Sequence, residues 1–140
     1  MAEWPASEHL KDLLAAHVAV SGWQIEIGTM PDTPSQVIMI SDTPGAPPNP
    51  KWLLDFPRCQ TLIRGEANDY LSTFREGKAV KDILLGVQSQ DINGDRLVSI
   101  TIAGDQAFIG RDESMRPMFS INFDLIIEPQ LVADSNRLAL

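Results

Sequence analysis

The sequence has little cysteine and no excess of positive charge. Cys59 is the single cysteine in 140 residues, which excludes an internal disulfide, a thiolate zinc cluster and a CxxC redox pair, and indicates a reducing compartment. Eleven Lys and Arg against nineteen Asp and Glu give a formal net charge of −8, so attraction to a phosphate backbone or an anionic membrane is not expected. No apolar run approaches the ~20 residues of a membrane span, and the N-terminus lacks a secretory signal pattern. We expect one soluble domain with its own core.

Motifs of catalysis and cofactor binding are also missing. The nine glycines form neither GxGxxG nor GxxxxGK[ST], so nucleotide binding has no support. His9 and His17 lie two helical turns apart without further ligands at metal spacing, which favours a surface histidine and one on a helix face. Cys59 is predicted to be a buried structural thiol, and DINGD at 91–95 has the wrong spacing for a calcium loop and is predicted to be a turn. We therefore predict no catalytic residues, no metal and no cofactor.

Apolar periodicity predicts two helices. The first is expected over about residues 8–20, with Ser7 as its N-cap and one face made of Leu10, Leu13, Leu14, His17 and Val18. The second is expected over about residues 69–85, after Asn68 and Asp69, with a stripe made of Tyr70, Phe74, Gly77, Val80, Leu84 and Val87. Gly77 costs ~1 kcal/mol of helix propensity but permits close approach to whatever lies beneath.

Short apolar or alternating segments predict about six strands, at residues 23–27, 36–41, 59–64, 97–102, 106–111 and 119–127. The last has the clearest alternation, and the proline-rich residues 42–50 are predicted to form an extended loop. The fold class is therefore α+β, a single domain with a mostly antiparallel or mixed sheet and two helices packed on one face. Residues 1–129 form this domain, and residues 130–140 are expected to be a loose C-terminal tail.

Two groups of residues are candidates for function, and each group allows two interpretations. Large apolar side chains from Trp52 to Phe56 follow the proline-rich loop, which favours anchoring to the core over burial under a partner. Charged side chains surround the last predicted hairpin, at Asp112, Glu113, Arg116 and Asp124. Paired carboxylates there are capable of acid–base work, but a solvated turn or a subunit contact is the better interpretation.

Six segments stand out, in this order: IGTMPDTP at 27–34, PPNPKWLLDFP at 47–57, QTLIRG at 60–65, ILLG at 83–86, IGRDE at 109–113 and RPMFSINFDLIIEP at 116–129. Together they resemble the tail terminator (minor capsid) family of long-tailed bacteriophages. The most specific pieces are the Arg-Gly after the third strand and the last segment, because each joins unusual residues at fixed spacing. The resemblance runs from about residue 22 to residue 129 and leaves the tail uncovered.

The resemblance implies a structural protein of the virion tail, assembled in the bacterial host cytoplasm, that is not an enzyme and needs no cofactor. It implies a hexameric ring of this chain on the last ring of tail-tube protein, which stops polymerisation and offers a surface to head-completion (connector or stopper) proteins. DNA would only pass through the lumen, which the negative charge permits, and no membrane is implied. The predicted contacts with a neighbouring subunit or the tail tube are Trp52, Arg64, Asp112, Arg116 and Asn122.

Two other classes remain as alternatives. A small-ligand-binding or enzymatic α+β domain would line a pocket with Trp23, Trp52 and Tyr70 and would be a monomer or dimer with a deep cleft. An acidic mimic of nucleic acid would need a contiguous carboxylate face, whereas the acidic residues here are dispersed along the chain.

Overall fold

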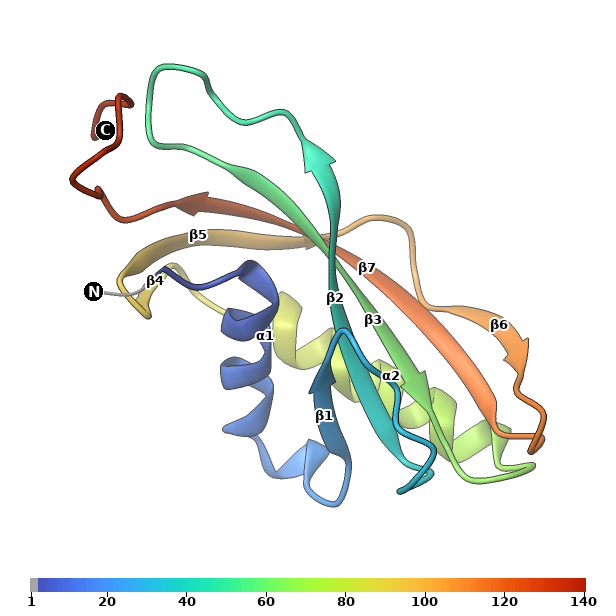
Figure 1. Ribbon diagram of the computed structural model, residues 1–140. Coiled ribbons are helices and arrows are strands. Elements are labelled where there is room, and N and C mark those ends of the chain that lie inside the picture. Colours follow the sequence, from blue (N-terminus) through green and yellow to red (C-terminus); the bar gives the residue numbers. More distant parts are fainter. Residues whose placement is uncertain (1–2) are drawn as a thin grey trace.

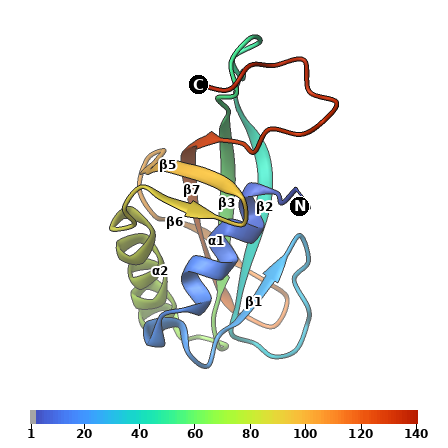
Figure 2. The ribbon, with the colours of Figure 1, turned by 90° about the vertical axis from the view of Figure 1, so that its left-hand side faces the viewer.

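A curled sheet with both helices on one face makes up the protein, of which the computed structural model describes residues 3–140 (Figures 1 and 2). The elements in order are α1 (Ala6–Ala15), a 3-10 turn (Val18–Val20), β1 (Gln24–Ile27), β2 (Val37–Ala46), β3 (Phe56–Arg64), α2 (Tyr70–Leu85), β4 (Gln90–Ile92), β5 (Asp95–Ile102), β6 (Ala107–Arg111) and β7 (Pro117–Glu128). The predicted α+β class is confirmed, with seven strands where about six were expected. No helix among residues 3–140 is long and apolar enough to cross a membrane.

The sheet is mixed and is organised around its longest strand, β7. The strand order is β1-β2-β3-β7-β5-β4, and β6 also pairs with β7. The β1–β2 pair is parallel and the others are antiparallel. One edge of β7 carries β3, and its other edge carries β5 and then β6. The predicted alternation is confirmed, because the core-facing side chains of β7 are all buried: Phe119, Ile121, Phe123, Leu125 and Ile127.

The first helix is shorter than predicted. It begins at Ala6 and ends at Ala15, so residues 16–20 are not part of it, and Val18 is 88% exposed. Ser7 is not the N-cap but lies inside the first turn, where its backbone N–H and its hydroxyl donate to the Asp42 carboxylate at 3.1 and 2.6 Å. The acceptor that the helix start needs thus comes from a strand thirty-five residues away, which local sequence does not reveal.

The second helix begins where the sequence predicts. The Asp69 carboxylate accepts a hydrogen bond from the Ser72 N–H at 3.2 Å. The buried face is Thr73, Glu76, Gly77, Val80 and Leu84, so the predicted stripe is correct from Gly77 onward, whereas Tyr70 and Phe74 are partly exposed at its margin. The predicted close approach at Gly77 is confirmed, because a Cβ there would collide with the Gln106 side-chain amide.

Several strands differ from the prediction in extent or alternation, and β3 begins at Phe56 instead of residue 59. Residues 42–46, expected in a loop, continue β2, and the register of the β2–β3 pair shifts between Thr43 and Ala46. Pro44, which has no N–H to donate, falls within that shift. In β5 a second shift, between Leu97 and Ser99, breaks the predicted alternation and leaves Val98 exposed. The short strand β4, which sequence analysis missed, pairs with β5 across the predicted Asn93–Gly94 turn.

Candidate functional site

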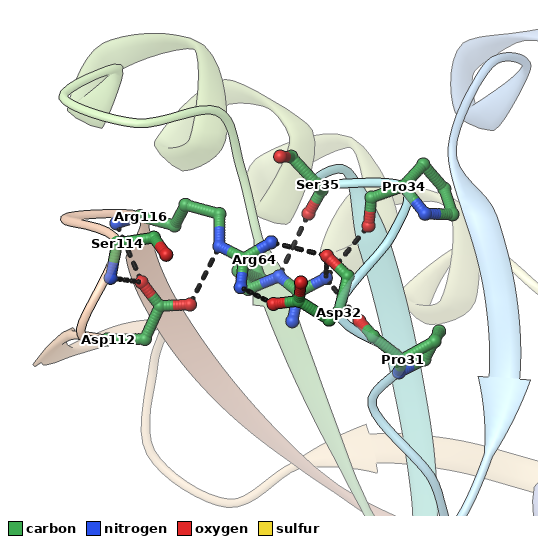
Figure 3. A network of polar contacts seen from close by, with 8 residues as sticks. All are labelled: Pro31, Asp32, Pro34, Ser35, Arg64, Asp112, Ser114 and Arg116. Atoms are coloured by element: carbon green, nitrogen blue, oxygen red, sulfur yellow. Dashed lines mark hydrogen bonds and ion pairs between the residues drawn. The ribbon is translucent and has the colours of Figure 1, made fainter.

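The five residues predicted to make contacts lie in three places. Arg64, Asp112 and Arg116 come together at the end of the sheet where β3 finishes and β7 starts (Figure 3). Asn122 lies on the face of β7 that the helices do not cover, and Trp52 lies in the loop between β2 and β3.

Arg64 is buried and bonds to backbone carbonyl groups of the loop between β1 and β2. Its Nε donates to the carbonyl of Ser35 at 2.9 Å, and its Nη2 donates to that of Pro34 at 2.8 Å. The same Nη2 also reaches the carbonyls of Pro31 and Asp32. One guanidinium thus holds a turn of consecutive residues, 31–35, against the end of β3.

Arg116 holds the same loop from the other side. Its Nη1 and Nη2 donate to the carbonyl and the carboxylate of Asp32 at 2.6 and 2.8 Å, and its Nε donates to the Asp112 carboxylate at 2.7 Å. Asp112 also accepts from the backbone N–H groups of Ser114 and Arg116, both at 3.0 Å. We call Arg64, Arg116, Asp112 and Asp32 the arginine clamp.

The electrostatics of the clamp follow from burial and from its internal pairing. Burial and the neighbouring Arg116 cation lower the pKa of Arg64, against the opposing effect of Asp112 and Asp32. Burial alone would raise the pKa of Asp112, but the N–H and guanidinium of Arg116 outweigh it and the pKa is lowered. Likewise, the hydrogen bonds from Arg116 to Asp32 and Asp112 outweigh its burial and raise its pKa. The pairing of Arg116 with Asp112 thus favours the charged form of both groups.

The clamp is an intramolecular structure. The resemblance implied contacts of Arg64 and Arg116 with a neighbouring subunit or the tail tube, whereas the ion pairs that Arg116 makes in this structure lie within one chain. Asp32 was missed as a functional residue, although PDTP lies inside a segment that carries the family resemblance. The carbonyl acceptors of Arg64 have no signature in the sequence, since every residue type carries one.

The loop that carries Trp52 is held by its backbone. The Asn49 side chain accepts from the N–H groups of Lys51 and Trp52 at 2.9 and 2.8 Å. Leu53 is buried, whereas the Trp52 side chain is 40% exposed with the Lys51 ammonium 5.3 Å from its ring centre. Leu53, and not Trp52, is therefore the side chain that anchors the loop.

The C-terminal segment, expected to be loose, lies along this loop. The Leu138 N–H donates to the Lys51 carbonyl at 2.7 Å, and the Leu138 carbonyl accepts from the Leu53 N–H at 2.8 Å. Arg137 donates to the Asp55 carboxylate at 2.7 Å and to two loop carbonyls. These bonds tie residues 137–138 to the loop, a contact between distant segments for which apolar periodicity has no pattern.

Asn122 belongs to a polar band across the uncovered face of the sheet. It stands opposite Gln60 of β3, and the next pair along is Arg58 with Asp124, whose side chains form an ion pair at 2.6 Å. Thr101 of β5 extends the row beyond Asp124. The side chains of this polar band are half-buried or exposed, in contrast to the buried apolar side chains on the helix-covered side of the sheet.

The cysteine and the two histidines are the remaining candidates for catalysis or metal binding. Cys59 is buried, as predicted, and burial, helped by the nearby Asp42 carboxylate, raises the pKa of its thiol to about 12. The two histidines exchange their predicted positions, since His17 is exposed while His9 is buried with its Nε2 2.8 Å from Asp95. Among residues 3–140, no three His, Cys, Asp or Glu side chains are grouped to hold a metal ion.

Comparison with known proteins decides which family this fold represents. The family model of the bacteriophage tail terminator protein matches residues 9–129, which include most of α1, all of α2 and all seven strands. The chain belongs to the bacteriophage tail terminator family. It is thereby a structural component of a phage virion tail, as the segments at 27–34 and 116–129 led us to expect.

A solved structure has the same fold as this tail terminator chain. It is a chain from the virion of a native gene transfer agent (GTA) particle, with a TM-score of 0.65 and 15% sequence identity. The alignment covers 85% of this chain and 91% of that chain. At this identity the likeness concerns the fold alone. A search of curated proteins gave no match.

Proposed function

We propose that this tail terminator chain forms a closed ring, hexameric as the resemblance implies, that sits on the last ring of tail-tube protein. The ring stops tube polymerisation and offers its other side to a head-completion protein. The protein acts through contacts and catalyses no reaction. The observation that carries this proposal is the family match across residues 9–129.

Features of the chain agree with such a role. The clamp closes one end of the subunit with internal bonds, so the subunit is a rigid unit ready for assembly. Large apolar side chains remain exposed outside the core, including Trp4, Trp52, Tyr70 and Phe108, as expected for a protein that buries surface against partners. The net charge of −8 disfavours adhesion of DNA that passes through a ring of such subunits.

The experiment that tests the proposal is a tube-length assay. Tail-tube protein is polymerised alone and in the presence of this chain, and tube lengths are measured by negative-stain electron microscopy. We expect long, heterogeneous tubes without the chain and shorter tubes capped by an annular density with it. As a control, the chain is added after polymerisation is complete, which should give capped ends without shortening. Uncapped tubes of unchanged length in both orders of addition would refute the terminator role.

A further inference from the structure

A cluster of aromatic side chains is exposed where α2 begins and β6 lies. Tyr70, Phe74 and Phe108 are 42%, 39% and 40% exposed. They surround the buried Phe119, with ring centres 5.0, 5.9 and 5.5 Å from it. Tyr70 and Phe108 also contact each other, at 5.1 Å. We call these three side chains the aromatic cluster. They belong to α2 and β6 and pack against the buried ring of Phe119.

The margin of the aromatic cluster is apolar and basic. Leu71 is exposed on the first turn of α2, and Arg75 lies one turn further along the same side. The Arg111 guanidinium lies 5.2 Å from the Phe108 ring centre. Among residues 3–140, neither Arg75 nor Arg111 has an ion-pair partner, in a chain with an excess of carboxylates. Aromatic rings with arginine are the composition typical of the centre of a protein–protein interface.

The opposite end of the molecule carries a hollow of the opposite charge. Near the C-terminal segment and the β2–β3 loop (Figure 1), a cavity of about 280 Å³ is lined by Trp4, Leu53, Pro129 and others. It adjoins two further hollows, of about 450 and 170 Å³, that share Pro129 with it. Together they are lined by six carboxylates: Glu3, Asp42, Asp55, Asp91, Asp95 and Glu128. We call this the acidic pocket.

The acidic pocket keeps a net negative charge after its internal pairs are considered. Its two cations, Arg96 and Arg137, are already paired with Asp91 and Asp55. The carboxylates of Glu3 and Glu128 have no ion-pair partner among residues 3–140. Trp4 and Leu131 add exposed apolar surface, being 45% and 62% exposed. The pocket therefore offers apolar walls with a carboxylate rim, the complement of the aromatic cluster with its two free arginines.

We propose that the aromatic cluster of one copy of this chain docks into the acidic pocket of the next copy. The inference rests on the proposed function, since it names the contact that would join subunits in the ring. Two different, complementary surfaces at opposite ends of one chain make a heterologous contact, which closes into a ring when the rotation between copies permits. A two-fold dimer would instead need a surface complementary to itself, which two free arginines beside the same cluster do not provide.

Two double variants test the contact, each changing exposed side chains that hold no core position. The cluster variant is Leu71→Asp with Arg111→Glu, and the pocket variant is Glu3→Lys with Leu131→Lys. The control is Val18→Asp with Lys11→Glu, which makes the same kinds of change as the cluster variant on and after α1, away from both surfaces. Circular dichroism and thermal melting establish that each is folded. Should a double variant melt well below the control, the single changes Arg111→Glu and Glu3→Lys replace it.

Sedimentation velocity over a range of concentrations then gives the answer. The wild type and the control should associate beyond a dimer, and each variant should associate at least roughly tenfold more weakly. An equimolar mixture of the two variants retains one intact cluster and one intact pocket, so the two variants should form complexes with each other. A wild type that stays monomeric, a variant that associates like the wild type, or a mixture that stays monomeric would overturn the proposal.

The outcome is separable from that of the proposed function. If the variants still associate while wild-type protein caps tubes, the contact is wrong and the terminator role stands. If the wild type and the mixture behave as expected but tubes are never capped, the contact stands and the terminator role falls.

Discussion

The arginine clamp and the Trp52 loop lie at the two ends of β3, and they differ in what they leave exposed. In the clamp, the two arginine side chains are buried and are bonded within the chain, to backbone carbonyl groups and to the carboxylates of Asp32 and Asp112. In the loop, the backbone is bonded within the chain while the Trp52 ring stays open. A buried guanidinium needs hydrogen-bond partners in the same chain, whereas a partly exposed aromatic ring destabilises the monomer little and stays available to a partner. Of the predicted contacts, Trp52 is therefore better placed for a partner than the two arginines.

Among the substitutions that test this difference, Arg64→Ala is expected to change the stability of the monomer most. Arg64→Ala removes the donors that hold four carbonyl groups of residues 31–35, so we expect the free energy of unfolding to fall by about 3 kcal/mol or more. Urea denaturation of the monomer measures the loss. The matched control is Arg96→Ala, which breaks an exposed ion pair and should cost about 0–1 kcal/mol.

A small loss of stability in Arg64→Ala, comparable to that in Arg96→Ala, would contradict this interpretation of the clamp. It would mean that the clamp contributes little to the monomer. Weakened ring formation in a fully stable Arg64→Ala monomer would then return Arg64 to the predicted intermolecular contact.

Adjacent residues in the loop provide the second test. Leu53→Ala removes the buried side chain that anchors the loop and should cost about 2–5 kcal/mol. Trp52→Ala should leave the monomer folded, with a loss below about 1 kcal/mol, because much of the ring already faces solvent. It should instead weaken ring formation or capping and give tails of abnormal length in a complementation assay. Circular dichroism and thermal melting distinguish the two variants.

The result at Trp52 has two ways to fail. Unfolding of Trp52→Ala would make it a core anchor, which is the alternative that the sequence favoured. Normal tail lengths with a folded monomer would mean that the loop has no role in assembly.

The sequence predicts a structural element well when the residues that determine it are close to one another in the chain. The alternation of β7 is visible because each buried residue from Phe119 to Ile127 contributes to one period. The start of α2 is visible because its cap, Asp69, precedes it directly. Failures occur where a distant group intervenes. The start of α1 depends on Asp42, and the Arg64 partners are carbonyls that no residue type encodes.

The candidate site shows the same limit. Asp112 and Arg116 have the spacing of a local ion pair, and their contact could be anticipated from the chain alone. The aromatic cluster could not, because Phe108 meets Tyr70 only after β6 pairs with β7. The predicted stripe placed Tyr70 and Phe74 toward the core, whereas the structure leaves both partly exposed.

Glu76 is a buried ionisable group without a partner in the described part of the chain, so it contrasts with the paired side chains of the clamp, and a smaller effect on stability is expected there. Glu76 of α2 is buried, and its Oε2 has no hydrogen-bond partner among residues 3–140. Burial raises its pKa from the usual 4.5 to about 7. The folded state thus holds this proton more tightly than the unfolded state, and the stability from Glu76 falls as the pH rises from about 4.5 through about 7.

Glu76→Gln should remove this pH dependence, because the amide cannot ionise. We expect the variant to be more stable than the wild type by about 2 kcal/mol at pH 8 and nearly equal to it at pH 4, as measured by urea denaturation. Only the difference between the two proteins is interpreted, since other carboxylates titrate in both. Glu66→Gln, which removes an exposed carboxylate just before the same helix, is the control and should show no such difference. A Glu76→Gln variant that is equally stable at both pH values would show that Glu76 is ionised at little cost. The contrast drawn from the clamp, that a buried charge requires a partner within the chain, would then not hold under α2.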